Sequence, residues 1–105
     1  MKTSKVKKLL RTKSGVEFNE GETVTIDSFE DSPSWIRARS GDKTIVTRAE
    51  SAYEKFTGFI KQPSMKTLEK WSFDGFAKTI DGCRVEPDGI CQHGMPSWLL
   101  ALSYI

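Results

Sequence analysis

The chain has 105 residues, a length that suits one compact domain or two small units sharing a core. Lysine and arginine number 16 and aspartate and glutamate 14, and a net charge of +2 excludes the broad positive field of a strongly basic nucleic-acid-binding protein. Hydrophobic residues make up 37% and charged residues 29%, which excludes wholesale disorder and fibrous repeats.

The charges are unevenly distributed along the chain. Residues 2–13 carry only basic charges, whereas residues 14–34 carry only acidic ones. We expect the basic arm to be a solubilising tail that can add to DNA binding. It holds no apolar run long enough for export or for crossing a bilayer, so we expect a cytoplasmic protein with two reduced thiols, Cys83 and Cys91.

The first half of the sequence has the pattern of short strands. Alternating or β-branched segments separated by glycine-containing turns lie at residues 9–12, 16–18, 23–26, 35–39 and 43–47. They predict a small curled antiparallel sheet or an SH3-like barrel, formed by a β-rich unit over residues 1–48. We expect its core to contain Phe18, Val24, Ile26, Trp35 and Ile45.

The second unit, residues 49–105, begins with helical spacing. Apolar residues recur every three to four positions from Arg48, which predicts a first helix ending near Gly58. Ser64 is suited to cap a second helix, whose inner stripe would contain Met65, Leu68 and Trp71. The second helix would end at Asp74-Gly75.

A hairpin is predicted around Asp81-Gly82, a pair that favours a two-residue turn. That turn pairs Ile80 with Cys83 and places Cys83 on the apolar face of the hairpin. Pro96-Ser97 can open a last helix, although a terminal strand is an alternative. We expect the apolar tail, residues 95–105, to close the core; the alternative is an exposed interface. The chain as a whole is thus expected to be α+β.

The order helix, turn, helix, hairpin over residues 50–86 resembles the winged helix-turn-helix of MerR-like regulators and phage excisionases. The resemblance rests on the following positions: Ala52, Gly58, Ser64, Thr67, Leu68, Trp71 and Gly75. It implies that the second helix enters the major groove of DNA and that the hairpin follows the backbone. A short match of this kind covers about a third of the chain.

The tail from Arg84 to Ile105 carries VEPDG followed by HGMPSWLLAL and resembles the ending of uncharacterised bacteriophage and prophage proteins. This implies a phage-type accessory or regulatory protein in a bacterial host cell. It implies no mechanism.

The winged resemblance implies a non-catalytic DNA-binding face. Its members are Lys66, Thr67, Lys70, Lys78 and Arg84. The lysines of the second helix lie four positions apart, where they can contact phosphates and a base edge. The alternative is that these lysines lie on an ordinary solvated helix face, with Glu69 as their charge partner.

An alternative function is a protein-interaction module, such as a phage inhibitor or adaptor of a host protein, acting as a monomer or homodimer. It would use the acidic residues Glu30 and Asp31 together with Trp98 of the tail. The two functions differ in their partner: DNA for the first and a host or phage protein for the second.

The candidate metal ligands are Cys83, Cys91 and His93, with Glu86 or Asp88 as the fourth. The spacing C-x7-C-x-H is not a common zinc pattern, and the chain has no CxxC pair. Catalysis by Cys91 and His93 would also need an acid that orients the histidine, and the sequence shows no evident one. We therefore expect neither a metal nor another cofactor, and no enzyme activity.

Overall fold

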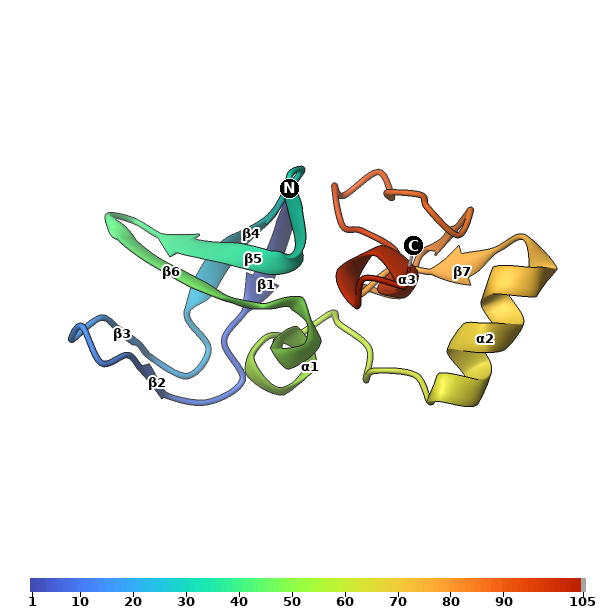
Figure 1. The fold of residues 1–105 in the computed structure, drawn as a ribbon. Helices are drawn as coiled ribbons and strands as arrows, with labels where there is room; N and C mark the ends of the chain where they lie inside the picture. Colours follow the sequence, from blue (N-terminus) through green and yellow to red (C-terminus); the bar gives the residue numbers. More distant parts are fainter. Residues whose placement is uncertain (105) are drawn as a thin grey trace.

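The computed structural model of the protein describes residues 1–104. Its main element is an antiparallel four-stranded sheet in the order β1-β4-β5-β6. These strands span the following ranges: β1 Lys2–Lys5, β4 Thr23–Phe29, β5 Ser32–Ser40 and β6 Lys43–Arg48. Figure 1 shows the sheet at one end of an elongated molecule and helix α2 (Met65–Asp74) at the other. The prediction of an α+β chain with an N-terminal antiparallel sheet is confirmed.

Strand β1 was not expected. Its pairing with β4 places Lys2 opposite Ile26 and Ser4 opposite Val24, so residues 2–5 are an edge strand and not a frayed tail. The alternation of the strand turns Lys2 and Ser4 toward the core and Thr3 and Lys5 toward solvent.

The sheet does not close into an SH3-like barrel. Within residues 1–104, β1 and β6 are its edges, and a separate short hairpin pairs β2 (Leu10–Arg11) with β3 (Glu17–Phe18). Of the predicted core residues, Phe18, Val24 and Ile26 are fully buried and Ile45 is partly buried. Trp35 is the exception, because it is 39% exposed on the outer face of β5.

The first predicted helix is shorter than its spacing suggested. It consists of a 3-10 turn, η1 (Ala49–Ser51), and α1 (Ala52–Lys55). Phe56 is already extended, with φ −131°, and it pairs with Val6 beneath the sheet. Burial of the Phe56 ring in the core therefore ends the helix before Gly58.

Helix α2 begins and ends as predicted. The Ser64 hydroxyl accepts a hydrogen bond from the Thr67 backbone N–H, and Gly75 has the left-handed φ of 77° that ends a helix. Leu68 and Trp71 are buried, but Met65 is 64% exposed and was wrongly placed on the inner stripe. Figure 1 shows α1 and α2 apart and joined by an extended segment, so the helix-turn-helix arrangement is not confirmed.

The predicted hairpin is present as β7 (Ala77–Lys78) and β8 (Arg84–Val85), and the last helix is α3 (Trp98–Ala101). Ser97 caps α3 by accepting from the Leu100 N–H. Trp98 and Leu99 are buried, which confirms that the tail closes the core. Ile105, the last residue of the predicted tail, lies outside the described residues.

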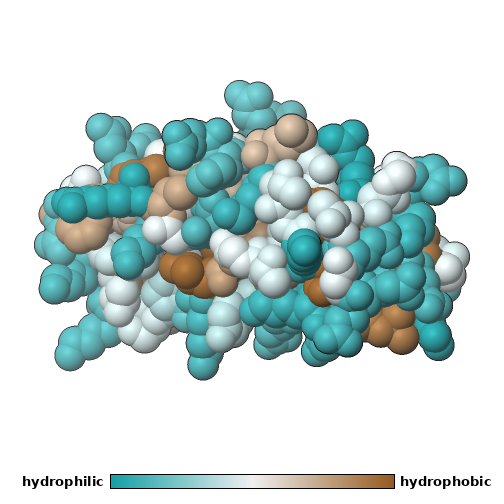
Figure 2. Space-filling model, turned by 180° about the vertical axis from the view of Figure 1, so that it is seen from behind, coloured by the Kyte–Doolittle hydropathy of each residue, from teal (hydrophilic) through white to brown (hydrophobic). Residues whose placement is uncertain are grey.

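One face of the molecule is mostly hydrophilic. On the face turned away from the viewer of Figure 1, apolar residues form small separate groups among polar ones (Figure 2). Among the described residues, no helix has the length and apolar character needed to cross a membrane.

Candidate metal centre

Two tight turns lie side by side because the backbone segments that carry them pair with each other. Thr79 forms a bridge with Ser97, and the Ile80 N–H donates to the Pro96 carbonyl at 3.1 Å. The turn that follows Ile80 is thereby placed next to the turn that precedes Pro96. Residues ten positions apart in the chain meet at this point.

The first turn spans residues 79–83 and is one residue longer than predicted. Lys78 pairs with Arg84, and the Thr79 N–H donates to the Cys83 carbonyl at 2.8 Å, which leaves a three-residue loop. Gly82 takes φ 87°, as the left-handed position of such loops requires. The shift places Ala77 and Thr79, and not Lys78 and Ile80, on the side of Cys83 and Val85, and the Cys83 sulfur lies 3.4 Å from the His93 Nδ1 atom.

The second turn spans residues 91–94. The Gly94 N–H donates to the Cys91 carbonyl at 2.8 Å, and the Cys91 N–H donates to the Met95 carbonyl at 3.0 Å. Gly94 has φ 81°, and a Cβ there would lie 3.1 Å from the Met1 nitrogen. The turn holds the side chains of Cys91 and His93 on one side, where both lie near the first turn.

Four donor side chains converge between the two turns, and their ligand atoms all lie within 4.8 Å of one another. We call this group the candidate metal centre: Asp81, Cys83, Cys91 and His93. The His93 Nδ1 atom lies 3.4 Å from the Cys83 sulfur, 3.6 Å from the Cys91 sulfur and 2.9 Å from an Asp81 carboxylate oxygen. The Asp81 oxygens lie 3.4 to 3.8 Å from the two sulfur atoms.

These separations match the edges of a tetrahedron around Zn²⁺. Ligand bonds of about 2.3 Å to sulfur and about 2.0 Å to nitrogen or oxygen place neighbouring donors roughly 3.3 to 3.8 Å apart. The sulfur–nitrogen and sulfur–oxygen distances lie within this range, and only the 2.9 Å contact between His93 and Asp81 is shorter. The four donors therefore lie close enough together to share one ion.

The Asp81 carboxylate is the most enclosed member of the centre. Its side chain has no exposed surface, it accepts a hydrogen bond from the Thr79 hydroxyl, and the Lys2 ammonium lies 3.5 Å away. Burial raises the pKa of Asp81, but hydrogen bonds from Thr79 and Cys91 and the charges of Lys2 and His93 outweigh it, so the pKa is below its usual value.

The pKa of the Cys83 thiol is shifted in the opposite direction. Burial, followed by a hydrogen bond with Cys91 and the charge of Asp81, raises the pKa of Cys83 above that of a free thiol. Two thiols and a carboxylate held this closely repel one another once they ionise. A bound dication removes that repulsion, because it favours the deprotonated form of every ligand.

The geometry does not suit a catalytic triad. A triad uses both ring nitrogens of histidine, one toward the nucleophile and the other toward the orienting acid. Here both sulfur atoms and the Asp81 carboxylate face the same nitrogen, Nδ1 of His93. Convergence on one point is the arrangement of ligands around an ion.

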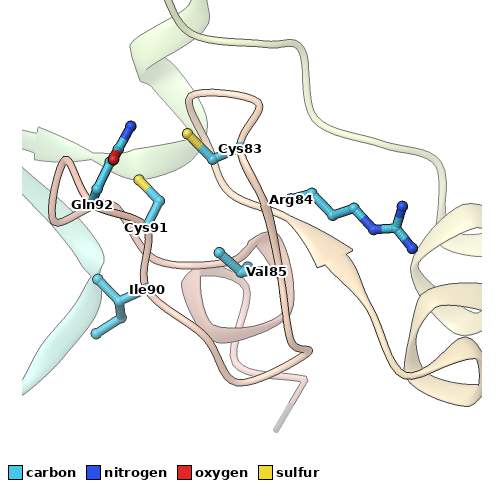
Figure 3. A pocket seen from close by; sticks show the side chains of 6 residues that line it. All are labelled: Cys83, Arg84, Val85, Ile90, Cys91 and Gln92. Carbon is cyan, nitrogen blue, oxygen red and sulfur yellow. The ribbon is translucent and has the colours of Figure 1, made fainter.

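A pocket of about 340 Å³ adjoins the centre. Figure 3 shows the Cys83 and Cys91 side chains at one end of it, above Val85 and Ile90, while Arg84 extends away. The guanidinium of Arg84 lies over the Phe76 ring, 4.4 Å from its centre, and so takes no part in the metal centre. The pocket gives solvent and ions access to the two thiols.

The residues of the predicted DNA-binding face lie on two elements. Lys66 and Lys70 are exposed on α2, whereas Thr67 is half-buried at its first turn. The hairpin residues Lys78 and Arg84 are direct cross-strand partners and both are exposed. The structure thus brings the two hairpin cations together.

The residues of the alternative partner surface differ in their exposure to solvent. Glu30 and Asp31 are exposed in the turn between β4 and β5, but Trp98 is only 1% exposed and belongs to the core. Glu86 and Asp88, considered as fourth ligands, are exposed and outside the candidate metal centre. The fourth ligand of the centre is instead Asp81, which the hairpin prediction had used only as a turn-forming residue.

The function is inferred from the geometry of the site, because comparisons with known proteins identify no relative. No protein-family model matches the chain, and no match is found among curated proteins or solved structures.

Proposed function

We propose that this protein binds one Zn²⁺ ion at the candidate metal centre and that the ion stabilises the C-terminal half of the fold. The observation that carries the proposal is the convergence of two thiols, one imidazole nitrogen and one buried carboxylate within 4.8 Å. Sulfur and nitrogen donors in a tetrahedral set favour zinc over calcium or magnesium, which prefer oxygen ligands.

The ion would have a structural role. Zinc sites with four protein ligands are usually closed, whereas catalytic sites leave one position open for water or substrate. Each turn supplies two ligands, so the ion would link the β7–β8 hairpin to the loop before α3. Lys2 beside Asp81 extends this link to strand β1 of the sheet.

Metal analysis of the purified chain tests the proposal. We expect one zinc per chain after purification without chelators, and near-complete loss of zinc in Cys83→Ser, Cys91→Ser and His93→Ala. Asp88→Asn is the matched control, because Asp88 is an exposed carboxylate outside the centre. Wild-type protein that holds no zinc, or a Cys83–Cys91 disulfide in freshly purified protein, would overturn the proposal.

We keep DNA binding by a phage-type accessory protein as a second proposal, because Lys78 and Arg84 are paired and exposed on the hairpin. Four lysine or arginine contacts to phosphates predict weak binding with a slope of about −0.9 per phosphate in log affinity against log salt. A mobility shift on duplex DNA should weaken in Lys70→Ala and Arg84→Ala. Unchanged retention of both variants would reject this face.

A further inference from the structure

We infer that the outer face of the four-stranded sheet binds single-stranded nucleic acid. The inner residues of β5, Ile36 and Ala38, are fully buried, so Trp35, Arg37 and Arg39 point to the opposite face. This is independent of the zinc proposal, since no ligand of the candidate metal centre lies on the sheet.

The register gathers cations on this face. Trp35 lies opposite Arg48, and Arg37 lies between Val46 on β6 and Asp27 on β4. Arg39 and, from β1, Lys5 extend the same surface. The outward-facing positions of the strands thus hold four cations and a single acid, Asp27. The Asp27 carboxylate lies 2.9 Å from Arg39 and 3.6 Å from Arg37.

Aromatic rings are interleaved with these cations. Trp35 is 39% exposed, and the guanidinium carbon of Arg48 lies 5.1 Å from its ring centre. Arg37 lies 5.6 Å from the centre of the Phe29 ring on the neighbouring strand. Arginines beside the exposed Trp35 ring and the half-buried Phe29 ring hold their charge next to a surface on which a base can stack.

Single-stranded nucleic acid fits this surface better than a duplex or a protein does. The bases of a duplex are stacked on one another and only its phosphates and groove edges are accessible, so no base can stack on Trp35. A typical protein partner needs an apolar centre, but Val46 is the one exposed aliphatic residue among the outward positions of the described sheet strands. Outward threonines at positions 3, 23, 25 and 44 supply hydroxyl groups for phosphates and base edges.

The acids around the face limit where a strand can lie. Glu30 and Asp31 occupy the turn at one end, Asp42 the turn at the other, and Glu50 lies 3.6 Å from Arg48. A nucleic-acid strand would therefore lie along the middle of β5, over Trp35, Arg37 and Arg39. The distance along the strand from Trp35 to Arg39 is roughly 13 Å, which spans about three nucleotides.

Fluorescence anisotropy with labelled oligo-dT and oligo-rU of about ten nucleotides tests this inference on the full-length, zinc-supplemented protein. We expect binding that weakens with salt at a slope of about −2, which corresponds to three phosphate contacts at about −0.7 each. Comparison of the two oligonucleotides distinguishes DNA from RNA. Trp35→Ala should weaken binding about tenfold or more, whereas Trp35→Phe, which keeps a ring, should restore most of it.

A matched control lies on α2, at the opposite end of the molecule (Figure 1). Phe73 is 89% exposed, so Phe73→Ala removes an exposed ring without touching the sheet. This variant should bind like wild type, while Arg39→Ala and Arg48→Ala should bind several-fold more weakly. No binding to either oligonucleotide at low salt, equal loss in Phe73→Ala, or preference for duplex DNA would overturn the inference.

Discussion

The ammonium group of Lys2 lies 3.5 Å from the Asp81 carboxylate, which joins strand β1 to the candidate metal centre across most of the chain. The Asp81 side chain has no exposed surface and that of Lys2 is 17% exposed, so this ion pair is largely removed from solvent. Removing one partner of such a pair leaves an uncompensated buried charge. The contact therefore links the stability of the sheet to the state of the centre.

Lys2→Met should destabilise the metal-free protein by about 2 kcal/mol, because Asp81 then loses its cationic partner. The loss should be smaller in zinc-loaded protein, where the ion compensates the carboxylate. Urea unfolding with and without zinc measures both values. Lys5→Met is the control, since Lys5 is exposed on the outer face of the same strand. Equal destabilisation with and without zinc would contradict this coupling.

Removal of zinc by a chelator should lower the melting temperature by about 10 °C or more. Free zinc a thousandfold above its dissociation constant adds about 4 kcal/mol to the stability, and 1 kcal/mol shifts the midpoint of a small domain by several degrees. Thermal unfolding followed by circular dichroism measures the shift. The Cys91→Ser variant should melt at the lower temperature regardless of zinc, and a zinc response in that variant would assign the effect to another site.

The acid stability of the sheet should depend on Glu22. Its carboxylate lies 2.8 Å from the Lys43 ammonium, and hydrogen bonds from Lys43, Ser40 and the Asn19 backbone lower the pKa of Glu22 to about 2. Because the pKa is about 4.5 in the unfolded chain, the contribution to stability is complete above that pH and is lost as the pH falls toward 2.

Glu22→Gln should therefore reduce stability at neutral pH and flatten its fall between pH 4.5 and 2. Chemical unfolding across this range measures the slope, with Glu20→Gln as the exposed control from the same turn. A slope that is as steep in Glu22→Gln as in wild type would assign the acid sensitivity to other groups.

Two tryptophans should differ sharply in their contribution to stability. Trp98 is 1% exposed in the core, so Trp98→Ala should cost about 3 to 5 kcal/mol of unfolding free energy. Trp35 lies on the outer face of the sheet, and Trp35→Ala should cost about 1 kcal/mol or less. Urea unfolding of the two variants checks this order, and a larger loss for Trp35→Ala would contradict the assignment of its face.

Local signals in the sequence predicted much of the fold. Ser64 and Gly75 bound a helix because a hydroxyl cap and a left-handed glycine act within a few residues, independently of tertiary structure. The exposure of Trp35 was also present in the pattern, since Trp35 shares its parity with Arg37 and Arg39. The aromatic character of Trp35 had outweighed that parity in the prediction of the core.

The candidate metal centre could not be predicted from linear spacing alone. Asp81 and Cys83 lie two positions apart, as do Cys91 and His93, a spacing that can place both members of a pair on one side, but it does not show that the two pairs meet. Both pairs lie in glycine-containing turns, where alternate residues can share a side. The signal was thus a repeated pair of donors in a turn, D-x-C followed by C-x-H, in a chain that has no CxxC pair and in which Asp81 was expected only to form the turn.

X-ray absorption spectroscopy at the zinc edge of the purified protein tests the central claim most directly. The candidate metal centre predicts one zinc per chain with two sulfur neighbours at about 2.3 Å and two nitrogen or oxygen neighbours at about 2.0 Å. Asp81→Asn should alter the lighter shell and leave the two sulfur neighbours in place. Zinc surrounded by oxygen and nitrogen alone, or protein that takes up no zinc under reducing conditions, would contradict the claim.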